Sequence, residues 1–208
     1  MTTAFETYEL EPGAREKFDL LLGELARAYE AEGRPGGDEA VTALKSAIGR
    51  PFRRRPGRSD AGPLLEAACG LVNALPIARR VLECASLLDW ECWEGTGLAE
   101  DISSNLHTTE LVGPDGHIYA ESARVGLLVS ERGTDYPISS HSGEETYLVI
   151  AGVAEWTVGA QDYTPQPPGS LVHHPAWVPH GRRTANEPFL GAWRWSGDLD
   201  LSSFSVSE

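Results

Sequence analysis

The sequence has 208 residues, enough for one compact domain or a domain with an appendage, and its hydrophobic fraction of 41% can build a core. Its formal net charge of −14 excludes nucleic acid and anionic membranes as expected partners, because phosphate binding needs a positive surface. The three cysteines have no C-x-x-C spacing, and we find neither a signal peptide nor an apolar run of membrane-spanning length. We therefore expect a cytoplasmic protein with reduced cysteines.

The first 95 residues carry the apolar spacing of amphipathic helices. Apolar side chains recur at intervals of three and four in segments 14–32, 38–48, from 59 or 60 to 75, and from 76 to 88. Residues 1–13 show no period, and we expect an arm that packs on a neighbour. The basic run 50–58 contains two prolines and is expected to be a loop. We predict an N-terminal helical region, residues 1–95, that packs on the domain after it.

Residues 96–208 have a different pattern, in which the apolar period changes from 3.6 toward 2. Short apolar segments such as HTTELVG, ETYLVIAG, VAEWTVGA, SLVHHP and FLGAWRW alternate with turns rich in Gly, Pro, Asp and Asn. Many short strands at this spacing are typical of a sandwich or a small barrel. The sequence thus predicts a mainly β domain from residue 96 to the end.

Within this domain, the stretch YPISSHSGEETYLVIAG concentrates side chains that bind metals or move protons. His141 and Glu145 lie four positions apart at the edge of a predicted strand, where an imidazole and a carboxylate can reach one divalent ion. A third ligand must come from another strand, and His180 is the best candidate. His173 and His174 are alternatives, and by strand alternation only one of them can face the interior. We interpret both as structural, with His174 better placed to contact a metal-binding residue.

Two tyrosines and four tryptophans are the next candidates. Tyr147 lies two residues beyond Glu145, so both side chains point to the same face of the strand. Because a divalent cation favours phenolate, Tyr147 or Tyr136 could be a metal ligand or a general base; a wall-lining role is equally open. The indoles are expected in the core or, facing the cavity, on a cationic group of the substrate: Trp156, Trp177, Trp193 and Trp195.

These stretches resemble the paired motifs of the cupin superfamily. The matching positions are His141, Glu145 and Gly152 in the first motif, and Pro167, Gly169 and His180 in the second. The resemblance implies a cupin double-stranded β-helix, that is, a jelly-roll barrel. Ser139 departs from it, standing where the family has a further histidine, and its hydroxyl could hold a metal-bound water or the substrate. The remaining three ligands suit iron, zinc, manganese or nickel.

The run YP…H…E-x-Y…G-x-A-x-W looks more specifically like the cupin dimethylsulfoniopropionate (DMSP) lyases of the DddQ type. This resemblance implies a carbon–sulfur lyase that binds one divalent transition metal through His141, Glu145, His180 and Tyr147. Tyr147 or Tyr136 would start a β-elimination that releases dimethyl sulfide and acrylate from a cationic sulfonium carboxylate.

Two other functions stay open at this point. One is a different metallocupin enzyme, a dioxygenase or an isomerase, since the same ligands permit those reactions. The other is a cupin that binds a small molecule without converting it. The sequence also leaves open whether the protein is a homodimer.

Overall fold

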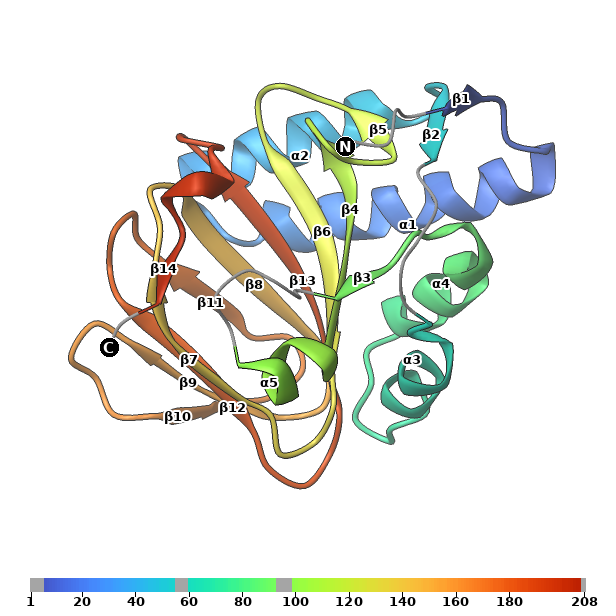
Figure 1. The fold of residues 1–208 in the computed structure, drawn as a ribbon. Helices are drawn as coiled ribbons and strands as arrows, with labels where there is room; N and C mark the ends of the chain where they lie inside the picture. Colours follow the sequence, from blue (N-terminus) through green and yellow to red (C-terminus); the bar gives the residue numbers. More distant parts are fainter. Residues whose placement is uncertain (1–5, 55–59, 93–98, 207–208) are drawn as a thin grey trace.

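The computed structural model describes residues 6–54, 60–92 and 99–206. Two β-sheets enclose a cavity, and helices cover the outside of the larger sheet (Figure 1). The larger sheet has the order β11-β8-β13-β6-β4-β3, with β5 paired to β4. Its strands are β3 (Glu91–Cys92), β4 (Leu106–Gly113), β5 (Ile118–Tyr119), β6 (Arg124–Ser130), β8 (Glu144–Ala151), β11 (Leu171–His174) and β13 (Phe189–Ser196).

The smaller sheet has the order β10-β9-β12-β7-β14. Its strands are β7 (Asp135–Ser140), β9 (Ala154–Val158), β10 (Thr164–Gln166), β12 (His180–Thr184) and β14 (Ser205–Val206). The consecutive strands β7, β8 and β9 alternate between the two sheets, so all three contribute side chains to the interior that the sheets share. This mainly β architecture, with helices N-terminal to it, is the cupin fold that the sequence predicts.

The helical region contains four of the five α-helices of the described residues. They are α1 (Pro12–Glu30), α2 (Pro35–Ala47), α3 (Gly62–Cys69) and α4 (Ile77–Cys84), followed by the turn η1 (Ala85–Leu87); α5 (Glu100–Ser104) and η2 (Leu201–Ser203) come later. The first, second and fourth predicted helices are confirmed within a few residues. Prolines at the first turns of α1 and α2 suit positions where a backbone N–H has no partner within the helix.

The prediction for the third helix is wrong beyond Cys69. The sequence predicts a helix that reaches Leu75, but the helix ends at Cys69, with Gly70 next, and Val72 is fully exposed. Glycine weakens a helix, and the following backbone finds a different partner, since the Leu75 N–H donates to the carbonyl of Ile150 in β8 at 2.9 Å. A tertiary hydrogen bond to the sheet therefore replaces the last helical turns; the predicted start at residue 59 lies outside the described residues.

The N-terminal arm and the basic run pair with each other instead of forming an arm on a neighbour and a loop. β1 (Glu6–Tyr8) and β2 (Phe52–Arg54) form a short antiparallel ladder. The Arg53 guanidinium donates to the carbonyls of Gly113, Pro114 and Gly116, and so fixes the turn that follows β4. Residues 1–5 and 55–58 of these two predicted segments lie outside the described residues.

The helices and the larger sheet share one hydrophobic core. Phe18, Leu22 and Leu25 of α1 belong to the same buried cluster as Val125 and Leu127 of β6. The predicted boundary at residue 95 lies outside the described residues, although β3 already belongs to the sheet. None of the described helices is long and apolar enough to cross a membrane.

A fully buried arginine ties the helical cover to the sheet. Arg194 of β13 points outward and forms ion pairs with Glu32, in the turn after α1, and with Glu144 of β8. The cysteines Cys69, Cys84 and Cys92 are all free thiols, as predicted, and burial raises the pKa of Cys84 to about 12.

Candidate metal centre

Glu145 occupies the middle of the site because of the strand register around β8. Its cross-strand neighbours are His174 on β11 and Trp195 on β13. His174 Nδ1 lies 3.0 Å from Glu145 Oε2, and the Trp195 indole N–H donates to Oε1 at 2.8 Å. Each carboxylate oxygen is therefore held from a different side, which fixes the orientation of the group.

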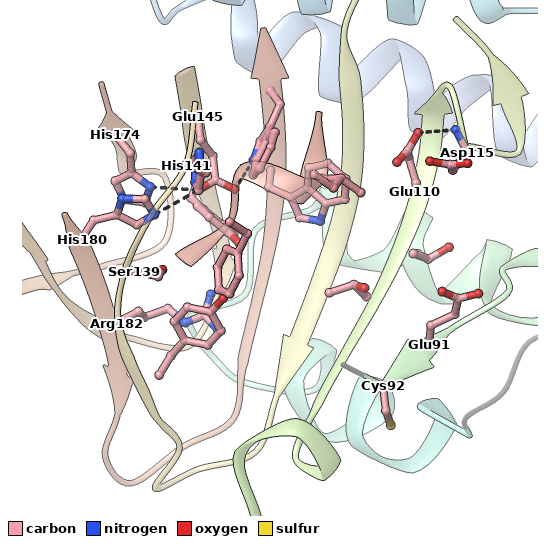
Figure 2. A pocket seen from close by; sticks show the side chains of 18 of the residues that line it. Glu91, Cys92, Glu110, Asp115, Ser139, His141, Glu145, His174, His180 and Arg182 are labelled. Atoms are coloured by element: carbon pink, nitrogen blue, oxygen red, sulfur yellow. Dashed lines mark hydrogen bonds and ion pairs between the residues drawn. The ribbon is translucent and has the colours of Figure 1, made fainter. Parts of the chain in front are cut away.

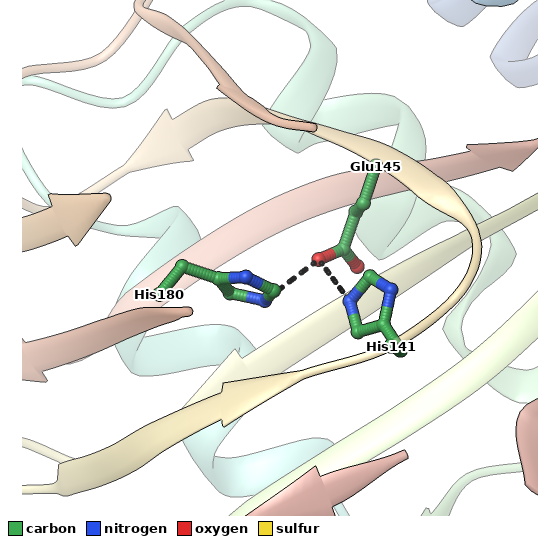
Figure 3. Close-up of side chains that lie close together, drawn as sticks. All are labelled: His141, Glu145 and His180. Atoms are coloured by element: carbon green, nitrogen blue, oxygen red, sulfur yellow. Dashed lines mark ion pairs between the residues drawn. The ribbon is translucent and has the colours of Figure 1, made fainter. Parts of the chain in front are cut away.

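His141 and His180 bring their Nε2 atoms to the same carboxylate oxygen (Figure 3). His141 follows β7, and His180 begins β12; their Nε2 atoms lie 3.4 and 3.6 Å from Glu145 Oε2. One ligand atom from each of the three residues lies within 4.8 Å of the others, and all three residues are buried. The structure thus brings together the ligands predicted from two distant motifs.

The hydrogen bonds of the two imidazoles fit a metal site. His141 Nδ1 lies 2.9 Å from the carbonyl of Gly143, and His180 Nδ1 lies 2.9 Å from the carbonyl of Val178. A carbonyl only accepts hydrogen bonds, so each Nδ1 carries the proton and each Nε2 can offer its lone pair to an ion. Two such imidazoles and a carboxylate form a donor set for a divalent transition metal.

Electrostatics favour a cation at this point. Burial opposes charging of the histidines: it lowers the pKa of His174, and burial together with the nearby His174 lowers the pKa of His180 to about 3. Burial would raise the pKa of Glu145, but the adjacent imidazoles of His141 and His174 outweigh it and hold that pKa well below its ordinary value. The centre therefore contains an ionised carboxylate with no lysine or arginine paired to it among the described residues.

A second group of possible ligands has a different character. Glu32, Glu144 and His173 also come close together, on the outer face of the sheet. Arg194 lies between the two carboxylates and already balances their charge. As predicted from alternation, His174 faces the interior and His173 faces outward.

The centre opens into a cavity of about 640 Å³ that runs between the sheets (Figure 2). Tyr136 of β7 and Tyr147 of β8 line it. Burial raises the pKa of both phenols; the Glu145 charge raises that of Tyr147 further, and Arg182 opposes the rise in each. Their roles as base or ligand stay predictions.

The four tryptophans predicted to contact the substrate fall into two groups by position. Trp156, Trp193 and Trp195 line the cavity, whereas Trp177 is 61% exposed and is not among the lining residues. The expected substrate contact of Trp177 is not supported by this position: the residue lies in the turn before β12, and only its backbone N–H reaches the site, donating to the carbonyl of His141 at 2.8 Å. Ser139 lines the cavity beside its cross-strand neighbour His180, and its side chain is buried.

Sequence reasoning missed Arg182. This residue is two positions after His180 on β12, so strand alternation points both side chains into the cavity, and that spacing was the available signal. The bond from Trp195 to Glu145 was also missed, because it depends on which strands become neighbours.

A two-sheet barrel with two histidines and a glutamate from its two motif regions defines the class: a cupin with a candidate metal centre. Comparison with known proteins is more specific. The family model for dimethylsulfoniopropionate lyase matches residues 50–191. The chain therefore belongs to the dimethylsulfoniopropionate lyase family, and it is accordingly a carbon–sulfur lyase.

Individual relatives agree with this family. Dimethylsulfoniopropionate lyase DddQ of Ruegeria pomeroyi is 28% identical over 188 residues, which cover 89% of this chain and 92% of the relative. The crystal structure of DddQ from Ruegeria pomeroyi DSS-3 superposes with a TM-score of 0.70 at 23% identity, over 92% of this chain and 96% of that one. A chain from the crystal structures of the DMSP lyases RdDddP and RnDddQII gives a TM-score of 0.69 at 23% identity, over 94% and 100%.

Proposed function

We propose that the protein cleaves DMSP to dimethyl sulfide and acrylate by β-elimination, and that the reaction depends on one divalent transition metal. The observation that carries this proposal is the convergence of His141 Nε2, Glu145 Oε2 and His180 Nε2, with both Nδ1 atoms held by carbonyls. Family membership and the name of the relative DddQ support DMSP as the substrate.

Iron, zinc, manganese or nickel would suit the two imidazoles and the carboxylate, with the Tyr147 hydroxyl as a further ligand or as the base. When bound, such a cation withdraws charge from an adjacent carboxylate and stabilises phenolate. His174 and Trp195 hold Glu145 in position for this role. Loss of the contacts that orient metal ligands commonly costs about 10- to 100-fold in metal affinity.

The base would be Tyr147 or Tyr136, whose rings come from opposite sheets. A phenolate takes the proton from the carbon next to the substrate carboxylate. The electron pair left on that carbon forms the C=C bond of acrylate, the C–S bond breaks, and dimethyl sulfide leaves as a neutral molecule. Because burial raises the pKa of both phenols, nearby positive charge is needed to make the phenolate accessible.

Trp193 is the tryptophan best placed to face the sulfonium. The Trp156 ring already faces the Arg182 guanidinium at 5.3 Å, and the Trp195 ring stacks on His141 at 4.0 Å. Trp193 lines the cavity and makes neither of these two contacts; its indole N–H donates to the carbonyl of Leu127. One face of its ring packs against Gly126, which leaves the other face for a cation–π contact.

The test is release of dimethyl sulfide into the headspace from DMSP and metal-loaded protein, followed by gas chromatography, with acrylate quantified in parallel. We expect equal amounts of the two products, and loss of both with His141→Ala, whose metal content is measured separately. Intact, metal-loaded protein that yields no sulfide would refute the proposal. Oxygen uptake under Fe(II) would instead favour the dioxygenase alternative.

A further inference from the structure

We propose that Arg182 forms an anion-binding subsite in the wall of the cavity, which takes the carboxylate of the substrate and of the acrylate product. The inference rests on the proposed function for the identity of the ligand, and on Arg182 itself for its chemistry. The substrate carboxylate would then bind Arg182 in addition to any contact with the metal.

The first observation is a buried guanidinium with an unused donor. Arg182 is 3% exposed, and its Nη2 has no hydrogen-bond partner. No carboxylate of the described residues lies within ion-pair distance of it; Glu145, the carboxylate at the metal centre, pairs with histidines instead. A buried charge without a counter-ion is costly, so an anion from outside the chain is expected at this point.

The other buried arginines of the described residues provide an internal comparison. Arg124 forms ion pairs with Glu110 and Asp115, and Arg194 forms ion pairs with Glu32 and Glu144. Each of these two guanidinium groups therefore has two carboxylates, while Arg182 has none. Arg182 also lines the cavity, whereas Arg124 and Arg194 do not.

Four aromatic rings surround the Arg182 guanidinium and provide no counter-charge. Strand register places Arg182 between Tyr136 on β7 and Trp156 on β9. Its guanidinium carbon lies 4.9 to 5.6 Å from the ring centroids of Tyr136, Tyr147, Trp156 and Phe189. Ring faces stabilise a guanidinium by cation–π attraction without occupying its in-plane N–H donors, and the Nη2 donors of Arg182, which have no partner, match a carboxylate.

The position of Arg182 suits the proposed reaction. Arg182 and His180 are two residues apart on β12, a span of about 7 Å, and both line the cavity, so one carboxylate between the metal centre and the guanidinium can contact both. A carboxylate on Arg182 brings the neighbouring carbon beside the rings of Tyr136 and Tyr147, the two candidate bases. The far side of the cavity carries Glu91, Glu110 and Asp115 (Figure 2), and Arg124 already pairs with the last two of these carboxylates.

The experiment is a ligand-observed NMR titration of the metal-loaded protein with acrylate and with acrylamide, its neutral isostere. We expect wild-type protein to bind acrylate at least tenfold more tightly than acrylamide. Arg182→Met should weaken acrylate binding at least tenfold and leave acrylamide binding unchanged, and Arg182→Lys should give an intermediate loss because it keeps the charge but not the planar fork. The matched control is Arg183→Met, the next residue on β12, which is exposed and pairs with Glu155.

Acrylate binding that is unchanged in Arg182→Met, or equal affinities of wild-type protein for the two ligands, would overturn the inference. Metal content and melting temperature are recorded for each variant; a purely structural Arg182 predicts a lower melting temperature with no preference for acrylate. If Arg182→Met does not fold, Arg182→Lys carries the test. Arg182-dependent acrylate binding without dimethyl sulfide formation would refute the proposed function alone, whereas sulfide formation with binding independent of Arg182 would refute the inference alone.

Discussion

Replacing Trp195 by phenylalanine isolates the contact that orients the metal-binding carboxylate. The substitution keeps an aromatic ring near His141, on which Trp195 stacks, but removes the N–H that donates to Glu145 Oε1 at 2.8 Å in a buried site. A hydrogen bond to a charged group contributes about 1.5–3 kcal/mol. At about 1.4 kcal/mol for each factor of ten, the expected loss of metal affinity is about 10- to 100-fold, which is the usual effect of removing such an orienting contact.

The assay is competition for the metal with a chelator of known affinity, at one pH and one ionic strength. The matched control is Trp193→Phe on the same strand, which loses a hydrogen bond to the carbonyl of Leu127 instead of the bond to Glu145. We expect the control to bind metal like the wild-type protein. Unchanged affinity in Trp195→Phe, or an equal loss in both variants, would show that the indole N–H does not orient the carboxylate.

Three further predictions concern the base, the pH dependence of stability and the packing of the cavity wall. Of Tyr136→Phe and Tyr147→Phe, the variant that lacks the base should lose about 10²-fold or more in turnover with its metal retained, whereas loss of a ligand should lower metal content; turnover and elemental analysis separate the two. Burial lowers the pKa of His117 in the folded protein. The contribution of this histidine to the free energy of unfolding is therefore complete above the unfolded pKa of about 6.5 and is lost as pH falls below it. In urea titrations, the free energy of unfolding of His117→Gln should depend less steeply on pH than that of the wild-type protein, by up to about 1.4 kcal/mol per pH unit. Gly126→Ala would place a methyl group against the Trp193 ring and should cost about 1–3 kcal/mol of unfolding free energy; an unchanged urea midpoint would contradict that packing.

The ligands of the candidate site were predictable because their spacing is local. His141 and Glu145 are joined by one short turn, and His180 follows a Pro-Gly turn and a short strand, so residue types and spacing sufficed to bring them together. The barrel and three helices were predictable for the same reason, since the change of apolar period near residue 96 is visible along the chain. The end of the third helix was not, because the Leu75 N–H bonds to β8, which is distant in sequence.

The groups that surround the ligands depend on strand order, which apolar spacing does not encode. Trp195 contacts Glu145 only because β13 lies beside β8, fifty positions away in sequence. Arg182 is caged only because β12 lies between β7 and β9. Trp177 shows the opposite failure: an indole in the right motif lies in an exposed turn, because composition does not reveal which way a turn points.

Consecutive residues of β13 face different surroundings. Trp193 and Trp195 line the cavity, and Arg194 between them forms an ion pair with Glu32 in the turn after α1. Only one layer of backbone separates the helical cover from the cavity, so we expect Glu32→Gln to lower turnover by shifting β13, without any contact between Glu32 and the substrate. In a genetic screen for inactive variants, some inactivating substitutions should then lie in the helical cover, because it holds the strands of the cavity wall in place. A search limited to residues near the substrate would not find them.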